Sequence, residues 1–263
     1  MDAFPGDLPA PRLAPETDAA DMLARKLGGF VDLDAADRAV LERVCGRARR
    51  YAGQTDLLRQ GEVPDAVIAV LRGFVCRGRH RPNGACQILA YLLPGDICGP
   101  DFSDLRPMDH VVTTLSACLV ARIPREVFLA MIDRHPNIAR ALRIARSVDE
   151  AVAREWLVSV GRRSARERLA HLFCELSVRL GAVGLAGADG YELPLTQVAL
   201  SDTVALTSVH VNRTLREMRR DGLIELKGRR LLILDAERLR AEAEFDAAYL
   251  RQAGPPAHRN EGG

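Results

Sequence analysis

The chain has 263 residues, a formal net charge of +2 and 48% hydrophobic residues, a balance typical of a folded protein rather than a disordered one. At ~100–200 residues per domain, this length allows one large domain or two smaller ones. No apolar run approaches the ~18 residues of a membrane helix, and the N-terminus lacks the basic start and apolar core of a secretory signal. We therefore expect a cytoplasmic protein with no membrane partner.

Proline and acidic residues concentrate near the start of the chain, and Pro255 and Pro256 lie in a polar, glycine-containing stretch at its end. Segments of this composition bury too little apolar surface to fold. The composition therefore predicts a disordered tail over residues 1–22 and a flexible tail over residues 246–263. Between them, Asp34 is a plausible N-cap for a short helix within 33–49.

Short β-rich runs separated by glycine follow this helix. They cover residues 66–71, 74–76, 87–93, 111–115 and 118–123. Turns every ~8–12 residues predict a barrel or a sandwich, and Asn83-Gly84 is a strong hairpin signal. With these two residues as the loop, Cys76 faces Tyr91 and Cys86 faces Arg81, so the two cysteines are not placed to form a disulfide.

The six cysteines are expected to be reduced, because no export signal is present and none lies in a C-x-x-C pair. Apolar neighbours favour buried packing roles for them. The absence of such pairs also argues against a zinc-ribbon or thioredoxin-type site.

A long helix is predicted from Pro136 to residue 162, since proline suits the first helical position and apolar residues then recur at helical spacing. This stripe consists of Ile138, Leu142, Ala145, Val148, Val152 and Trp156. It must be buried either against the β-rich region or against the same helix of a second chain. Periodicity alone favours neither.

Capping signals divide the next segment into helices. Ser164 can cap a helix that runs to Leu180, and a glycine-rich loop is expected at 181–190. Thr196 can cap a short helix over 197–204, and a turn at 205–207 precedes a second helix over 208–221.

Gly222 follows this second helix, as a C′ glycine should. Two strands joined by a Lys227-Gly228 turn come next, at 223–226 and 230–234. This order indicates a helix-turn-helix with a wing. Ala205 stands where such turns often have glycine, and a small residue fits there.

The outward face of the second helix is basic. Residues 208–230 contain seven Arg or Lys residues and three acidic residues, a local charge of +4. Arginines can neutralise phosphates and reach base edges from a recognition helix. A lone basic helix is more often a solvated surface, but here the turn, caps and basic wing favour DNA binding. The predicted DNA-binding residues are Thr196, Ser208, Val209, His210, Asn212, Arg213, Arg216, Lys227, Arg229 and Arg230.

Over residues 23–245 the chain resembles the Crp/Fnr family of bacterial transcription regulators. The matching runs, in chain order, are Leu57–Glu62 (LLRQGE), Leu71–Gly73 (LRG), Leu92–Asp96 (LLPGD), Ser164–Ala170 (SARERLA) and Val209–Leu215 (VHVNRTL). The resemblance implies an α+β protein with three parts. These are a jelly-roll-like β-roll over 23–135, a dimerisation helix over 136–162 that carries the apolar stripe, and a winged helix-turn-helix over 163–245.

The implied function is a sequence-specific transcription regulator that acts as a homodimer on an inverted-repeat operator. Its expected partners are double-stranded DNA, a second copy of the chain and, as a candidate, RNA polymerase. In relatives, an acidic residue and an arginine four positions later read bases. Arg213 matches the arginine but Val209 replaces the acid, so base readout should differ, with Ser208, His210 and Asn212 as substitutes.

Cyclic-nucleotide-binding relatives hold the ribose with a glutamate and the phosphate with an Arg-Ser pair. Asp96 stands at the glutamate position, and Met108 and Asp109 stand where the pair should be. A buried phosphate needs a cation, so we expect function independent of cyclic nucleotides. An iron–sulfur cluster is not expected, because relatives bind it through N-terminal cysteines and none precedes Cys45 here. No cofactor or metal is predicted.

Two alternative functions are compatible with parts of this pattern. One is a regulator that responds to a small molecule, to haem through His80 or His110, or to oxidation of Cys86 or Cys98. The other, an enzyme of the cupin type, fails because its metal site needs an H-x-H pair, which the chain lacks.

Overall fold

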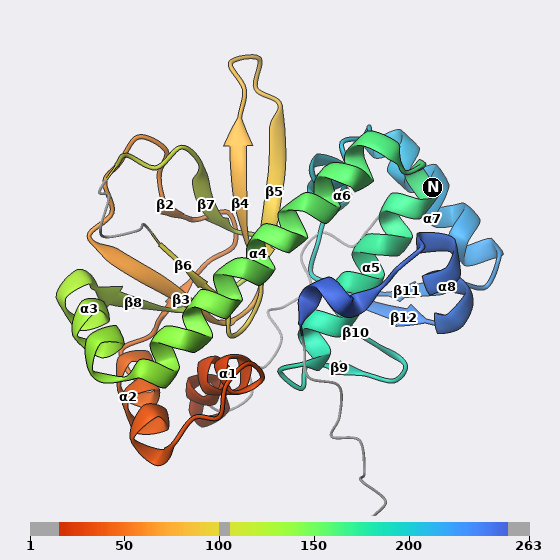
Figure 1. Ribbon diagram of the computed structural model, residues 1–263. Coiled ribbons are helices and arrows are strands. Elements are labelled where there is room, and N and C mark those ends of the chain that lie inside the picture. The colour runs from red at the N-terminus through yellow and green to blue at the C-terminus, as the bar shows by residue number, and fades with distance from the viewer. Residues whose placement is uncertain (1–15, 100–105, 252–263) are drawn as a thin grey trace, which may run out of the picture.

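The computed structural model describes residues 16–99 and 106–251, which form a β-rich N-terminal half and a helical C-terminal half. A long helix, α4, runs diagonally between the two halves (Figure 1). The predicted α+β class and the order of β-roll, long helix and winged helix-turn-helix are confirmed.

Two antiparallel four-stranded sheets make up the N-terminal half. The first has the order β1 (Arg49–Tyr51), β8 (Cys118–Pro124), β3 (Ala66–Arg72) and β6 (Ile97–Cys98). The second has the order β2 (Asp56–Leu58), β7 (Val111–Thr114), β4 (Val75–His80) and β5 (Cys86–Leu92). Side chains of both sheets, among them Ile68, Val70 and Val112, pack into one core.

The β4–β5 hairpin forms at the predicted turn, with Gly84 at φ +82°. Cys76 pairs with Tyr91 as expected, but Cys86 pairs with His80 instead of Arg81. A β-bulge between Arg77 and Gly78 shifts the register by one residue, a change that no turn signal reveals. All six cysteines are free.

Three helices cover the first sheet and its edges. They are α1 (Glu16–Gly28), α2 (Ala35–Cys45) and α3 (Arg125–Arg134). Asp34 caps α2 as predicted, in a capping box with Asp37. The tail predicted over residues 1–22 is wrong for residues 16–22, because α1 begins at Glu16 and buries Met22, Leu23 and Leu27. Residues 1–15 lie outside the described residues.

Helix α4 extends from Pro136 to Arg162, the predicted bounds. Its predicted dimer stripe, however, is mostly buried within the same chain. Ile138 packs with α1 and α2, and Val148, Val152 and Trp156 pack in the core that includes the DNA-binding half. Only Leu142 and Ala145 of the stripe are partly exposed. Periodicity locates a stripe that must be buried, but it does not identify the surface that buries it.

The C-terminal half begins with α5 (Ala165–Gly181), capped by Ser164 as predicted. A four-stranded sheet follows, with the order β11 (Ile224–Lys227), β12 (Arg230–Ile233), β10 (Gly190–Glu192) and β9 (Ala186–Gly187). Strand β9 and the start of β10 therefore lie in the segment 181–190 that was predicted to be a loop. Helices α6 (Gln197–Val204), α7 (Ser208–Arg220) and α8 (Ala236–Ala243) complete this half.

The predicted flexible tail over 246–263 is wrong for its first residues. A 3-10 helix, η1 (Ala247–Leu250), buries Leu250 completely. The Tyr249 hydroxyl donates a hydrogen bond to Glu175 Oε2 at 3.0 Å. Tertiary contacts thus order a short segment whose own sequence carries little helical signal; residues 252–263 lie outside the described residues.

Candidate nucleic-acid interface

Helices α6 and α7 form the predicted helix-turn-helix. The Thr196 hydroxyl accepts a hydrogen bond from the Ala199 amide at 3.0 Å, which caps α6 as expected. Ala205 ends α6 in the left-handed region at φ +54°, the conformation that explains why glycine is favoured at this position. Thr207 caps α7, which ends at Arg220, one residue before the predicted end.

The inner faces of these helices are buried. Leu200 and Val204 of α6 and Val211, Leu215 and Met218 of α7 are all in the core. Because one face of α7 is anchored there, the arginines between these positions must project into solvent. Val209 is 81% exposed, the largest exposure among the apolar side chains described as exposed.

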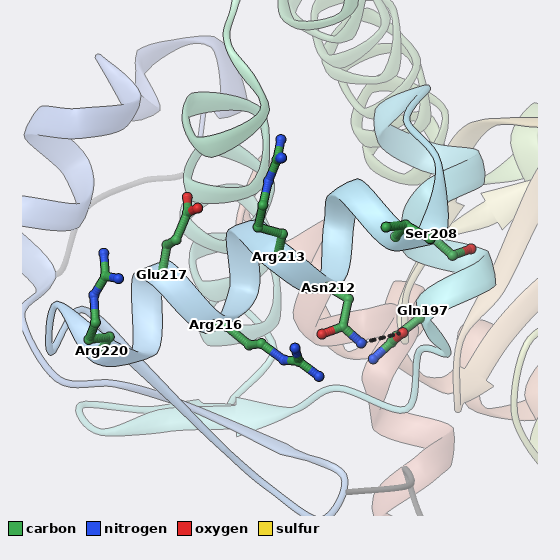
Figure 2. A pocket seen from close by; sticks show the side chains of 8 residues that line it. Gln197, Ser208, Asn212, Arg213, Arg216, Glu217 and Arg220 are labelled. Atoms are coloured by element: carbon green, nitrogen blue, oxygen red, sulfur yellow. Dashed lines mark hydrogen bonds between the residues drawn. The ribbon is translucent and has the colours of Figure 1, made fainter. Parts of the chain in front are cut away.

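An open groove of about 840 Å³ runs along the outer face of α7 (Figure 2). It is lined by Gln197, Ser208, Val209, Asn212, Arg213, Arg216, Glu217 and Arg220. The structure therefore brings together five of the predicted DNA-binding residues: Ser208, Val209, Asn212, Arg213 and Arg216. Thr196 and His210 lie outside the groove lining, and Lys227, Arg229 and Arg230 belong to the wing.

Gln197 is a groove residue that was not predicted. Its Oε1 atom accepts a hydrogen bond from Asn212 Nδ2 at 3.1 Å, which joins the start of α6 to α7 (Figure 2). The signal that could have revealed Gln197 is its place directly after the Thr196 cap, at the exposed start of the first helix. Glu217 and Arg220 complete the groove at its other end.

The charges around α7 leave its first arginines available. Within the described residues, Arg213 and Arg216 have no ion pair and are exposed. Asp221, at the end of α7, is instead bound by Arg166 at 2.6 Å and by Arg220 at 3.4 Å. The hydrogen bond from Arg166 lowers the pKa of the Asp221 carboxyl. Arg166 also pairs with Glu242 of α8 at 2.6 Å, so it fixes the far end of α7.

Two of the three basic residues predicted in the wing form ion pairs. Lys227 lies 3.0 Å from Glu225, and Arg230 lies 3.0 Å from Asp189. These pairs are exposed, and exposed pairs contribute only about 0–1 kcal/mol, so phosphates can replace them. The wing therefore supplies charge next to the groove rather than a fixed reading surface.

A second cavity, of about 760 Å³, separates the β-roll from α4. Its lining includes Asp96, Cys98, His110 and Asp149. Met108 is buried and Asp109 pairs with His110 at 2.7 Å, so neither of the two positions predicted for the phosphate-binding pair carries an arginine. Arg106, the nearest arginine in the sequence, is exposed.

Asp96, one of the acidic residues that line this cavity, already has partners. Asp96 lies 3.2 Å from Lys26 Nζ and 2.8 Å from Arg179 Nη2. Burial alone would raise the pKa of Asp96, but these two cations lower it below its usual range.

Cys98 accepts a hydrogen bond from Arg77 Nε at 3.3 Å, and Arg77 also pairs with Asp149 of α4 at 3.2 Å. Burial opposes ionisation of the Cys98 thiol, yet Arg77 and His110 lower its pKa. His80 lies at the exposed end of β4, away from this cavity lining. Among residues 16–99 and 106–251, no group of three or more His, Cys, Asp or Glu side chains could hold a metal ion.

Comparison with known proteins agrees with this architecture. Residues 48–135 match the cyclic nucleotide-binding domain, and residues 167–242 match the Crp-like helix-turn-helix domain. The transcriptional activator FnrL of Cereibacter sphaeroides is 32% identical over 220 residues, which cover 81% of this chain and 87% of FnrL. The chain belongs to the Crp/Fnr family.

Other relatives point the same way. The nitrogen fixation regulation protein FixK of Bradyrhizobium diazoefficiens is 28% identical over 213 residues, covering 80% of this chain and 87% of FixK. The solved structure of FixK2 from Bradyrhizobium japonicum has a TM-score of 0.66 and 24% identity. It covers 74% of this chain and 95% of FixK2, a likeness of fold.

As a member of this family, the chain is a DNA-binding transcription regulator and not an enzyme. The described part of this Crp/Fnr protein contains no helix with the length and apolar character needed to cross a membrane.

Proposed function

We propose that this Crp/Fnr regulator binds an inverted-repeat operator as a homodimer and does so without a cyclic nucleotide. The observation that carries the proposal is the groove along α7, where exposed Arg213 and Arg216 lie beside the polar side chains of Gln197, Ser208 and Asn212. A helix that presents arginine and amide groups on one exposed face has the chemistry to read base edges in a major groove.

The DNA part is tested by selecting bound fragments from random double-stranded DNA with the purified full chain. Selected sequences should contain two half-sites in inverted orientation, with centres about 34 Å apart, one helical turn. Footprinting should then protect both half-sites. Failure to enrich any sequence, or enrichment of a single unrepeated half-site, would contradict the proposal.

The homodimer is supported by the outward face of α4. This face retains Leu142 and Ala145, which are partly exposed, and Ala153 and Leu157, which are exposed, Leu157 to 75%. Apolar side chains in a line on a long helix favour burial by a second helix. The proposed interface is therefore rotated about the axis of α4 relative to the predicted stripe, because most of that stripe is buried within the same chain.

Light scattering tests the assembly directly. The unchanged chain should have about twice the 28.8 kDa monomer mass at micromolar concentration. Leu157→Asp should shift it towards the monomer, because the interface would then bury an unpaired charge. Leu185→Asp places the same charge at a leucine that is 42% exposed and away from α4, and it should leave the mass unchanged.

Independence from cyclic nucleotides is supported by the residues at the positions where relatives bind the phosphate. Met108 supplies no charge, Asp109 would repel a phosphate, and His110 is already paired with Asp109. An imidazole is a poor replacement for a bidentate guanidinium. In addition, Asp96, at the position of the ribose-binding glutamate in relatives, is engaged by two cations.

Isothermal titration with cyclic AMP and cyclic GMP at millimolar concentration tests this point. We expect no binding heat with micromolar affinity and no change in operator affinity. A saturable isotherm in the micromolar range would overturn the assignment.

One observation favours a second candidate function, a regulator that responds to oxidation. Cys98 lines the cavity between the β-roll and α4 and accepts a hydrogen bond from Arg77. The pKa of its thiol is lowered despite burial. A thiolate reacts with peroxides far faster than a thiol. Labelling of sulfenic acid after peroxide treatment should mark Cys98 before the other cysteines. Equal labelling of all six, or unchanged operator affinity of the labelled protein, would reject this function.

A further inference from the structure

Four buried charged side chains connect the two halves of the molecule. Lys26 lies on α1, Asp96 lies in the turn before β6, and Glu175 and Arg179 lie on α5 of the DNA-binding half. Arg179 donates to Asp96 Oδ2 at 2.8 Å, to the Tyr91 carbonyl at 2.8 Å and to Glu175 Oε1 at 3.1 Å. We call these four residues the junction network.

The junction network balances its own charge, with two cations and two carboxylates. The Arg179 side chain is 5% exposed, and those of Asp96 and Glu175 are 8% and 0% exposed. Every carboxylate oxygen has a donor, because the Leu93 amide also binds Asp96 and because Trp156 Nε1 and Tyr249 bind Glu175. A buried network is tolerated when its members are satisfied, and it then favours one specific arrangement over others.

The turn that carries Asp96 is shaped for these contacts. Gly95 has φ +92°, and a Cβ atom there would lie 2.6 Å from the Lys26 Cβ atom. Glycine at this position therefore allows α1 to approach the turn closely enough for Lys26 to reach Asp96.

A neighbouring set of contacts joins strand β5, which carries Tyr91, to the helix-turn-helix. The Tyr91 hydroxyl of β5 makes a hydrogen bond with Thr203 Oγ1 of α6, and Gln87 Nε2 donates to the Thr203 carbonyl at 3.1 Å. Tyr91 therefore contacts Arg179 through its carbonyl and α6 through its hydroxyl. A displaced Arg179 would also lose its hydrogen bond to the carbonyl of Tyr91, the residue whose hydroxyl contacts α6.

We propose that the Asp96–Arg179 pair is a latch that holds the DNA-binding half against the β-roll and sets the orientation of the recognition helix. The latch rests on the proposed function only for its effect on operator binding. In the latched arrangement α7 is open along its outer face, so the latch does not cover the DNA-binding groove. It keeps the helix-turn-helix in one position, and the DNA-binding half supplies Arg179, one of the two cations that neutralise Asp96.

Two matched substitutions separate this role from ordinary stabilisation. Arg179→Met breaks the contact between the halves and leaves Asp96 with Lys26. Lys26→Met removes the other buried cation of the same carboxylate, but Lys26 lies on α1, in the N-terminal half. Asp96→Asn keeps the shape of the side chain and an oxygen that can accept the hydrogen bond from the Leu93 amide. It therefore serves as a second test if Arg179→Met folds poorly.

The first readout needs no DNA. Trp156 is the single tryptophan, and it contacts both Glu175 and the Tyr91 ring. In Arg179→Met and Asp96→Asn, Trp156 emission should shift to longer wavelength and amide hydrogen exchange in residues 197–204 should accelerate. In Lys26→Met both signals should match the unchanged chain.

The second readout is affinity for the selected operator. Arg179→Met and Asp96→Asn should weaken it by 5–150-fold, the usual range for coupled sites, and Lys26→Met should not. Equal effects of Lys26→Met and Arg179→Met on all signals would show a merely stabilising network and overturn the latch. Unchanged fluorescence and exchange in Arg179→Met and Asp96→Asn would overturn it too. If no operator is found, the DNA-free signals still decide the latch, so the two proposals fail separately.

Discussion

Arg213 on α7 and Arg179 on α5 belong to the same half of the chain, yet their surroundings are opposite. Arg213 lies exposed in the open groove, and within the described residues it has no ion pair. Arg179 is buried and binds Asp96, Glu175 and a carbonyl oxygen. Water screens the first charge, so it costs little to leave unpaired until a phosphate or base arrives. The second charge would be very costly without partners.

This difference separates two kinds of function. Exposed arginines are available to an external ligand, whereas buried ones are committed to holding the protein's own parts together. Arg166 is intermediate, because it is half-buried and fixes α7 through Asp221 and α8 through Glu242. Substitutions at buried residues should therefore have larger effects than substitutions on the exposed surface.

The largest effect is expected from Val152→Asp. Val152 is 4% exposed and packs in the core beside Trp156, so the change buries an unpaired carboxylate. The free energy of unfolding should fall by about 3–5 kcal/mol in urea denaturation. Val158→Asp on the same helix, at a valine that is 47% exposed, should cost less than about 1 kcal/mol. Monomer formation with unchanged stability would instead restore Val152 to a dimer interface.

Acidification should lower the stability of the fold through His171, a buried residue of α5. Burial, helped by Arg163, lowers the pKa of His171 to about 4, whereas an unfolded histidine has a pKa of about 6.5. Between these values the unfolded chain binds a proton that the folded chain does not. Stability therefore falls as pH decreases from 6.5 to 4, by up to about 3 kcal/mol.

Chemical denaturation across this pH range checks the contribution of His171. In His171→Gln the loss of stability between pH 6.5 and 4 should be smaller by the same amount. An identical pH dependence in the variant and the unchanged chain would contradict the assignment.

On the exposed side, Arg213→Ala should cost about 1–3 kcal/mol at the selected operator and relax preference at one base position. Arg219→Ala is the control, since Arg219 is exposed on α7 outside the groove lining. It should weaken binding to all sequences alike. A mobility-shift titration that finds unchanged operator affinity for Arg213→Ala would reject α7 as the reading helix.

The smallest effects are expected in the wing. Arg229→Ala should reduce the dependence of log affinity on log salt by about 0.9, the value for one phosphate contact. Arg230 is paired with Asp189, so Arg230→Ala should change the salt dependence less. Fluorescence anisotropy at several salt concentrations measures both. A loss of base preference in either variant would show that the wing reads sequence.

Much of the DNA-binding half could be predicted because its signals are local. Thr196 and Ser164 cap their helices through their own side chains, and Gly222 at φ +71° follows α7. The inward residues of α6 and α7 follow from helical spacing. Gln197 was missed because its role depends on Asn212, fifteen residues away.

Other elements could not be predicted because distant parts of the chain stabilise them. Helix α1 starts in an acidic, proline-containing segment, but its Leu23 and Leu27 side chains pack in a core formed with the β-roll. The η1 turn is ordered by Leu250 in the core and by Tyr249 on Glu175. Neither contact has a signature in the neighbouring residues.

The amino-acid sequence by itself determined where helices and turns form and which side of each helix is apolar, because these depend on spacing and caps within a few residues. Tertiary structure alone decided what covers each apolar face and which charges find partners. Most of the α4 stripe is buried by the chain's own two halves, and Arg179 reaches Asp96 across 83 positions of sequence. Burial and pairing are properties of neighbours in space, and a helical period does not specify those neighbours.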